Sequence, residues 1–269
     1  MTDAHDQPVE DKLLAHREGA VGHIVFNNPA RHNAVSLEMW QRLQTLLTDF
    51  AVDPSLRVLV ISGAGGKAFV SGADISKFES ERASLEAVKQ YNATSARAYD
   101  QLYEFPKPTI ANIQGYCIGG GMNLAACCDI RIAADNAQFG IPAARLGLGY
   151  GFTGVNRLAR IIGITAATEL FYTARRITAH EAHDMGLLNQ IVPAAALDAK
   201  VAEWTGMIAE NAPLTIAAIK QAALEIGKPA HERDLAKLDR MVDACFASDD
   251  YIEGRRAFME KRPPKFSGT

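Results

Sequence analysis

Two glycine segments are the parts of this sequence whose residue types and spacing suggest chemistry most directly. One is SGADI at 71–75, and the other is GGG at 119–121. Glycine lets a backbone N–H group approach a ligand without an intervening side chain. The N–H groups in the first turn of a helix lack intrahelical acceptors. If the segments face each other, two N–H groups can donate to one oxygen and form an oxyanion hole; two tight turns without a catalytic role are the alternative.

The elements that must position these segments follow an α/β pattern. The first half alternates strands and helices; it contains no convincing sequence repeat, and a recurring strand–strand–helix unit in the first 150 residues is a hypothesis. A helix is expected after the N-cap residue Ser36 and is stopped at Asp53. The strands are predicted at 21–26, 57–63, 105–115 and 129–134, and further helices at 82–104 and 119–128. From about residue 155 the pattern is helical, with helix stops at Gly163, Gly186 and Gly227.

Composition excludes several classes of protein. The chain has 269 residues, of which 48% are hydrophobic, so a disordered chain is not expected. Its 28 basic and 31 acidic side chains give a net charge of −3, which argues against a nucleic-acid partner. No apolar run of about 18 residues is present, and the first 12 residues lack the features of a secretory signal. We therefore expect no membrane partner and a cytoplasmic location, with the four cysteines reduced.

Two other motifs are weaker. The segment from Gly63 to Ala68 formally fits GxGxxG/A, but the following Gly72 interrupts the helix that a dinucleotide site needs. His180 and His183 have a spacing that can ligate a metal on a helix, but no cysteine or carboxylate cluster accompanies them. We expect a solvated helix face there and no metal site.

Four segments resemble the crotonase superfamily, also called the enoyl-CoA hydratase/isomerase family. They are KAFVSGADI, FPKPTIANIQGYCIGGGMNLAACCDIRIAADNAQFGIP, RITAHEAHDMGLLNQIV and YIEGRRAFMEKRPPKF. The resemblance implies an α/β fold, a crotonase-like superhelix of ββα turns with a helical C-terminal trimerisation region. It divides the chain into a flexible N-terminus at 1–19, a core with the acyl-CoA site at 20–200 and a helical oligomerisation region at 201–269. The expected assembly is a homotrimer or a dimer of trimers.

The resemblance also implies site residues. The N–H groups of Ala73 and Gly120 would bind the thioester oxygen of an acyl-CoA. The substrate itself carries the coenzyme A, so no separate cofactor is implied. The residues matching the family's coenzyme A contacts are Ala30, Arg31, His32, Asp74 and Ile75, together with Phe258 and Lys261 from the C-terminal helix of a neighbouring subunit.

The sequence departs from the hydratases of this family at their acid–base positions. Where they carry two glutamates, this chain has Asn123 and Ala143. An amide does not titrate usefully and alanine has no polar side-chain atom, so neither can be a general base. The aspartate that family dehalogenases and dienoyl-CoA isomerases use is replaced by Gly151. The oxyanion hole is thus expected without the usual acid–base groups.

The stretch from Leu146 to Tyr150 resembles the methylmalonyl-CoA decarboxylase of the superfamily. That enzyme shares the tyrosine but has a histidine at the position of Ala73 and a threonine at that of Ile141. In a decarboxylase, Tyr150 could protonate the thioester enolate. Asn123 could bind a polar substrate group, and Arg145 could pair with a substrate carboxylate.

Three alternatives stay open for this site. The chain could hydrate or isomerise an enoyl-CoA, decarboxylate a malonyl-type CoA, or bind a CoA thioester without turnover. For Tyr150, the alternative to a chemical role is a place in the pocket wall. The leucine-rich stretch at 146–148 is expected to be at least partly buried.

Overall fold

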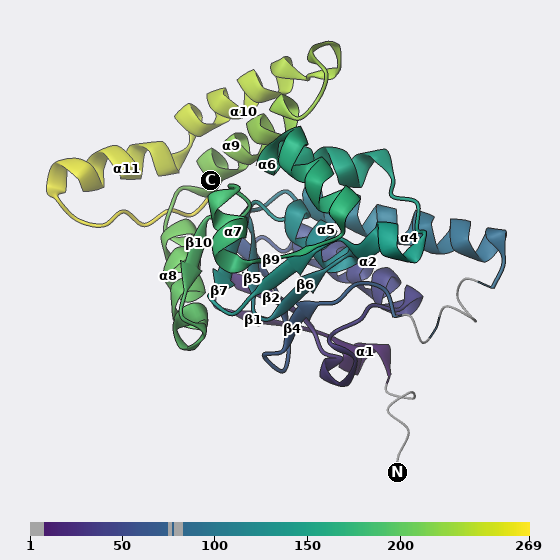
Figure 1. Cartoon of the computed structure of the whole chain (residues 1–269). Helices are drawn as coiled ribbons and strands as arrows, with labels where there is room; N and C mark the ends of the chain where they lie inside the picture. Colours follow the sequence, from purple (N-terminus) through teal and green to yellow (C-terminus); the bar gives the residue numbers. More distant parts are fainter. Residues whose placement is uncertain (1–7, 75–76, 78–82) are drawn as a thin grey trace.

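The computed structural model describes residues 8–74, 77 and 83–269, and these residues form two sheets (Figure 1). In the larger sheet only β1 is antiparallel to its neighbour, and in the smaller sheet only β9 is. The larger sheet has the order β1 (Leu13–Glu18), β2 (Val21–Phe26), β3 (Val58–Gly63), β5 (Thr109–Ile113), β7 (Ile130–Ala134) and β10 (Gln190–Val192). The smaller has the order β4 (Ala68–Val70), β6 (Tyr116–Ile118), β8 (Gln138–Gly140) and β9 (Arg176–Thr178).

Consecutive strands enter different sheets and are followed by a helix, which makes each repeat one turn of a superhelix. Strands β3 and β4 precede α4 (Leu85–Tyr103), and β5 and β6 precede α5 (Gly120–Cys127). Strands β7 and β8 precede the short 3₁₀ helix η3 (Pro142–Leu146) and α6 (Phe152–Thr173). The predicted α/β fold built from ββα turns is confirmed.

Most of the predicted helix boundaries are confirmed. Helix α2 (Leu37–Val52) begins where the Ser36 hydroxyl accepts the Met39 N–H, and it ends at Asp53. Gly163 breaks α6 with a φ of 79°. The other described elements are α1 (Val9–Lys12), η1 (Pro29–Arg31), α7 (Ala179–Asp184), η4 (Ala194–Ala196), α8 (Leu197–Ala209), α9 (Pro213–Ile226), η5 (Ala230–Glu232), α10 (Leu235–Ala247) and α11 (Asp249–Glu260).

The predicted flexible N-terminus at 1–19 is wrong for its second part. Residues 13–18 form the edge strand β1, which pairs with β2 along its whole length. Only Leu13 of this strand is buried, so its sequence lacks the apolar alternation that indicates a strand. The strand forms because it adds backbone hydrogen bonds to β2. Pairing of this kind does not require a hydropathy pattern, so the sequence does not indicate it.

The core has two parts, one on each side of the larger sheet. The main cluster includes the fully buried side chains of Trp40, Phe69 and Phe139 and lies between the sheets and helices α2, α4 and α5. The second cluster packs Val60 and its neighbours against α8. Cys127 and Cys128 are buried in the main cluster.

The C-terminal helices extend away from this core (Figure 1). Helix α9 is joined to the core by an ion pair: the Nζ atom of the buried Lys220 lies 2.5 Å from Oδ1 of Asp129. Helix α10 has no buried residue. Among the described helices, none is both long and apolar enough to cross a membrane.

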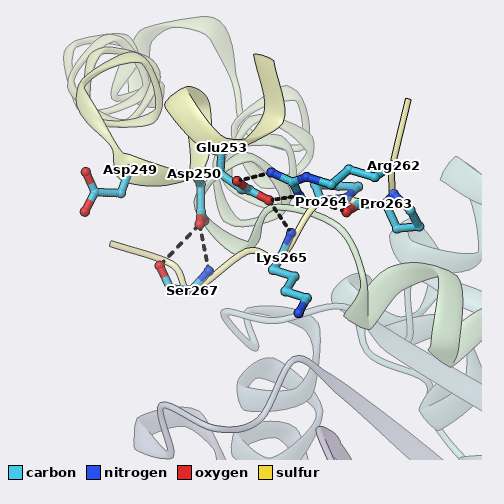
Figure 2. Close-up of a pocket in the computed structure, with 8 residues that line it drawn as sticks. All are labelled: Asp249, Asp250, Glu253, Arg262, Pro263, Pro264, Lys265 and Ser267. Atoms are coloured by element: carbon cyan, nitrogen blue, oxygen red, sulfur yellow. Dashed lines mark hydrogen bonds and ion pairs between the residues drawn. The ribbon is translucent and has the colours of Figure 1, made fainter. Parts of the chain in front are cut away.

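The C-terminal tail returns along α11 and is held by two acidic side chains (Figure 2). Glu253 accepts two hydrogen bonds from Arg262, at 2.6 and 2.9 Å. Asp250 accepts the backbone N–H groups of Ser267 and Gly268 at 2.7 and 2.9 Å. These contacts fix the orientation of α11, because they join its first half to the segment that follows it.

Candidate active site

The SGADI segment lies beside Val35, and this pairing aims the N–H of Ala73 away from it. Val35 donates its N–H to the Gly72 carbonyl at 2.8 Å and accepts the Asp74 N–H at 3.1 Å. Since N–H groups of successive residues in extended backbone point to opposite sides, the N–H of Ala73 faces the other side. Gly72 has a φ of 104°, a conformation that glycine adopts without strain.

That other side is occupied by the start of α5. A Cβ atom placed on Gly72 would lie 3.4 Å from the backbone nitrogen of Gly120, and one on Gly120 would lie 3.4 Å from the Cα of Gly72. Gly120 is the first residue of α5, so its N–H has no intrahelical acceptor. A Cβ on Gly121 would lie only 1.9 Å from the Val70 carbonyl oxygen. The structure thus brings the two glycine segments against each other, with no side chain between them.

Tyrosines on one face of α4 support this contact, and the sequence analysis missed them. The Tyr99 hydroxyl donates to the Gly120 carbonyl at 3.1 Å, and its ring packs against Trp40. Eight residues earlier, the Tyr91 hydroxyl donates to the Val35 carbonyl at 3.1 Å. Burial raises the pKa of Tyr99 well above the usual value of a phenol, so the hydroxyl stays protonated. Tyr91 and Tyr99 are eight residues apart, which places both on one face of a helix, and this spacing is the sequence pattern that could have identified them.

Asn123 and Tyr150 lie together, on either side of Gly154. A Cβ on Gly154 would lie 3.4 Å from Oδ1 of Asn123 and 2.6 Å from Cε1 of Tyr150. The Asn123 Oδ1 atom is buried and accepts no hydrogen bond from any described part of the chain. The Tyr150 ring packs on Phe171 at 4.8 Å, and burial raises the pKa of its hydroxyl. The side chains around Gly154 therefore include the Asn123 amide and the Tyr150 phenol, and the Arg157 guanidinium is near enough to Tyr150 to act on it electrostatically.

Ala143 is buried at the start of η3, and the chain then turns outward. Arg145 is exposed. The prediction that 146–148 is partly buried is wrong, because Leu146 and Leu148 are 53% and 40% exposed. Gly147 ends η3 with a φ of 65°, which directs these side chains to the surface. Tyr150 itself is half-buried.

Asn33 holds the loop expected to contact coenzyme A against the segment that joins β3 and β4. Asn33 is fully buried; its Oδ1 accepts the Asn28 N–H at 2.9 Å, and its Nδ2 donates to the carbonyls of Ala64 and Ala68 at 3.0 and 2.7 Å. The Ser71 N–H donates to the His32 carbonyl at 3.1 Å. Residues Ala30, Arg31 and His32 are exposed beside the buried Asp74, whereas Ile75 lies outside the described residues.

Phe258 and Lys261 are not brought to the glycine segments within one chain. They lie at the end of α11, which Figure 1 places far from α5. The Phe258 side chain is 83% exposed, and Lys261 ends the helix with a φ of 54°. Their position fits a role outside the subunit that carries them.

The chain is similar in sequence to known proteins. The model of the enoyl-CoA hydratase/isomerase family matches residues 16–269. The chain is 35% identical over 256 residues to a crotonyl-CoA hydratase of Syntrophomonas wolfei, covering 95% of this chain and 98% of that protein.

Solved structures show the same relationship. The fold matches a crystal structure of an enoyl-CoA hydratase/carnithine racemase from Magnetospirillum magneticum with a TM-score of 0.90, at 36% identity and with 96% of each chain covered. It matches an enoyl-CoA hydratase from Bacillus anthracis with a TM-score of 0.90, at 33% identity, covering 96% of this chain and 100% of that one. The chain is therefore an enzyme that belongs to the enoyl-CoA hydratase/isomerase family of the crotonase superfamily.

Proposed function

We propose that this enzyme binds an acyl-CoA and stabilises its thioester enolate between the backbone N–H groups of Ala73 and Gly120. The observation that supports this most directly is the close approach of Gly72 to Gly120. An oxygen placed between the segments would accept both N–H groups, one of them at the N-terminus of a helix. A single preorganised donor of this kind contributes about 3–4 kcal/mol to transition-state stabilisation.

The acyl-CoA would lie along the loop at 30–32 and the SGADI segment, which the hydrogen bond from the Ser71 N–H to the His32 carbonyl joins. Backbone groups at Ala30, Arg31, His32 and Asp74 are the proposed contacts for the coenzyme A portion. The names of the relatives indicate enoyl-CoA compounds as one substrate class. Hydration or isomerisation of an enoyl-CoA is therefore the first candidate reaction.

Decarboxylation of a malonyl-type CoA is the second candidate, and the lack of a carboxylate at positions 123 and 143 favours it. The two positions at which family hydratases carry glutamates hold Asn123 and Ala143, so neither provides a base. Decarboxylation needs none: the bond to the carboxylate carbon breaks, CO₂ leaves, and the electron pair enters the thioester enolate. A carboxylate at these positions would also repel that of the substrate.

The enolate formed in this way must take up a proton at its α-carbon. Tyr150 is the proposed donor, and bulk water would later restore its proton. The raised pKa of the hydroxyl keeps this proton in place before the reaction. Asn123, with its unpaired Oδ1 beside Tyr150, is the proposed contact for a polar substrate group.

We further propose that three chains, or two such trimers, form the active enzyme. Helices α9, α10 and α11 enclose a groove of about 570 Å³ with an apolar lining, and α10 exposes Leu235, Val242 and Phe246. Contiguous exposed apolar surface on this scale is typical of an interface. In such an assembly, Phe258 and Lys261 of one subunit would reach the acyl-CoA site of another.

Turnover of a panel of acyl-CoA compounds, with product masses measured, tests the function. The panel should contain crotonyl-CoA, malonyl-CoA and methylmalonyl-CoA. Gly120→Pro removes the N–H and should abolish turnover, whereas Gly120→Ala adds the same Cβ and keeps the N–H. Wild-type turnover in a folded Gly120→Pro variant would overturn the oxyanion hole. Binding of acyl-CoA without formation of any product would instead identify a protein that binds the thioester but lacks catalytic activity.

A further inference from the structure

The β1–β2 hairpin carries a cluster of metal-ligating side chains at the far end of the sheet from the active site. The cluster consists of His16, Glu18 and His23, which offer one ligand atom each, all within 4.8 Å of one another. It lies near the start of β2, whereas the loop at 30–32 follows the end of that strand. The candidate active site and the hairpin cluster therefore share no residue.

The register of the hairpin creates this cluster. His16 lies directly opposite His23, and their rings stack with centroids 4.8 Å apart and an angle of 6° between planes. Glu18 is two residues after His16, so it shares the same face of the strand. Its Oε1 atom lies 3.4 Å from Nε2 of His16. The two-residue turn at Gly19, which has a φ of 59°, keeps the strands in this register.

We propose that His16, Glu18 and His23 bind a late first-row transition-metal ion, with Zn²⁺ as the representative ion. Two imidazole nitrogens and one carboxylate oxygen suit such ions, whereas Ca²⁺ and Mg²⁺ require oxygen ligands. Ligands about 2 Å from Zn²⁺ in tetrahedral geometry lie roughly 3.3 Å apart. His16 and Glu18 already meet this spacing, and both side chains are exposed.

A bound ion would stabilise the pairing of β1 with β2 at the edge of the larger sheet. In β1 only Leu13 is buried, so the strand depends on its pairing with β2 rather than on side-chain packing. An ion held by residues of both strands would join them through their side chains. Binding to the folded chain alone would raise the thermal stability, and this gain grows with the logarithm of the free ion concentration above the Kd.

Zinc titration of the full-length chain, produced without a histidine tag and stripped with a chelator, tests this site. Isothermal titration at pH 7.5 should show one equivalent of Zn²⁺ per chain and a higher Tm when it is bound. His16→Asn and His23→Asn should each weaken binding by about tenfold or more, and Glu18→Gln by a smaller factor. The matched control is the His180→Gln/His183→Gln double variant, which removes two exposed histidines from α7 and should bind as the wild type does.

Co²⁺ titration provides a second measurement, since its visible absorption reports the ligand set directly. The His16→Asn/His23→Asn variant should lose the spectrum while keeping the wild-type circular dichroism. The proposal is overturned if the wild type shows no saturable Zn²⁺ binding, or if the double variant binds Zn²⁺ as tightly as the wild type. Acyl-CoA turnover should be unchanged in that variant, so failure of the metal site and failure of the proposed function are distinguishable.

Discussion

The Tyr99 hydroxyl donates a hydrogen bond of 3.1 Å to the carbonyl of Gly120, the residue whose N–H faces the SGADI segment. This bond joins the middle of α4 to the first residue of α5. Because α5 begins at Gly120, the orientation of that residue determines where its N–H points. Tyr99 is therefore a positioning residue for the proposed oxyanion hole.

Tyr99→Phe should lower kcat by about twofold to tenfold with a small change in KM, since a hydrogen bond of this kind contributes about 0.5–1.5 kcal/mol. Steady-state kinetics on the substrate found in the panel measures this. Tyr172→Phe, at a tyrosine that is 80% exposed, is the matched control and should leave both constants unchanged. A proportional rise in KM with kcat preserved would contradict the positioning role.

Wild-type hydration of crotonyl-CoA should be weak, because neither Asn123 nor Ala143 can act as a general base. Loss of an acid–base group costs about 10²–10⁴-fold in rate. Asn123→Glu/Ala143→Glu should raise the hydration rate, measured by loss of the enoyl absorbance. An efficient wild-type hydratase would show that another group activates the water.

Tyr150→Phe should reduce turnover while acyl-CoA affinity stays close to that of the wild type. The ring and its packing on Phe171 are kept, and only the hydroxyl that would protonate the enolate is lost. Single-turnover kinetics and equilibrium binding separate the two effects. Turnover within about twofold of wild type, or roughly 0.4 kcal/mol in barrier, would make Tyr150 a wall residue.

Asp129→Asn should destabilise the fold by about 3 kcal/mol, because it leaves the charge of Lys220 buried without its partner. Lys220 is only 7% exposed, and its Nζ is 2.5 Å from the Asp129 carboxylate. Lys220→Met removes the charge itself and should cost less. Urea unfolding at neutral pH measures both, and an equal loss in the two variants would refute this account.

The chain should assemble through its C-terminal helices into trimers or dimers of trimers. Light scattering at micromolar concentration should give at least three times the chain mass of 29.1 kDa. Phe246→Glu places a charge on a side chain that is 62% exposed in the isolated subunit, and it should reduce the mass. Glu232→Gln, at an exposed position in η5, is a surface control. A monomer mass for the wild type would rule out the assembly.

The sequence alone determined the features that depend on neighbours along the chain. Helix α2 has its N-cap at Ser36 and an apolar face, and both are local properties. The break at Gly163 is equally local, since it follows from the backbone freedom of one residue. The two glycine segments were recognised for the same reason, and the family resemblance indicated Ala73 and Gly120 as the proposed donors within them.

Tertiary structure decided everything that depends on which strands and helices meet. Strand β1 forms by pairing with β2, and that register places His16 opposite His23, seven residues later in the chain. Tyr99 acquires its role only because α4 packs beside α5. The outward turn after η3 exposes Leu146 and Leu148 although their residue type suggested burial. Hydropathy describes the preference of a single residue for water or for an apolar environment. Contacts between distant segments depend on strand register and helix packing, and these cannot be read from one stretch of sequence.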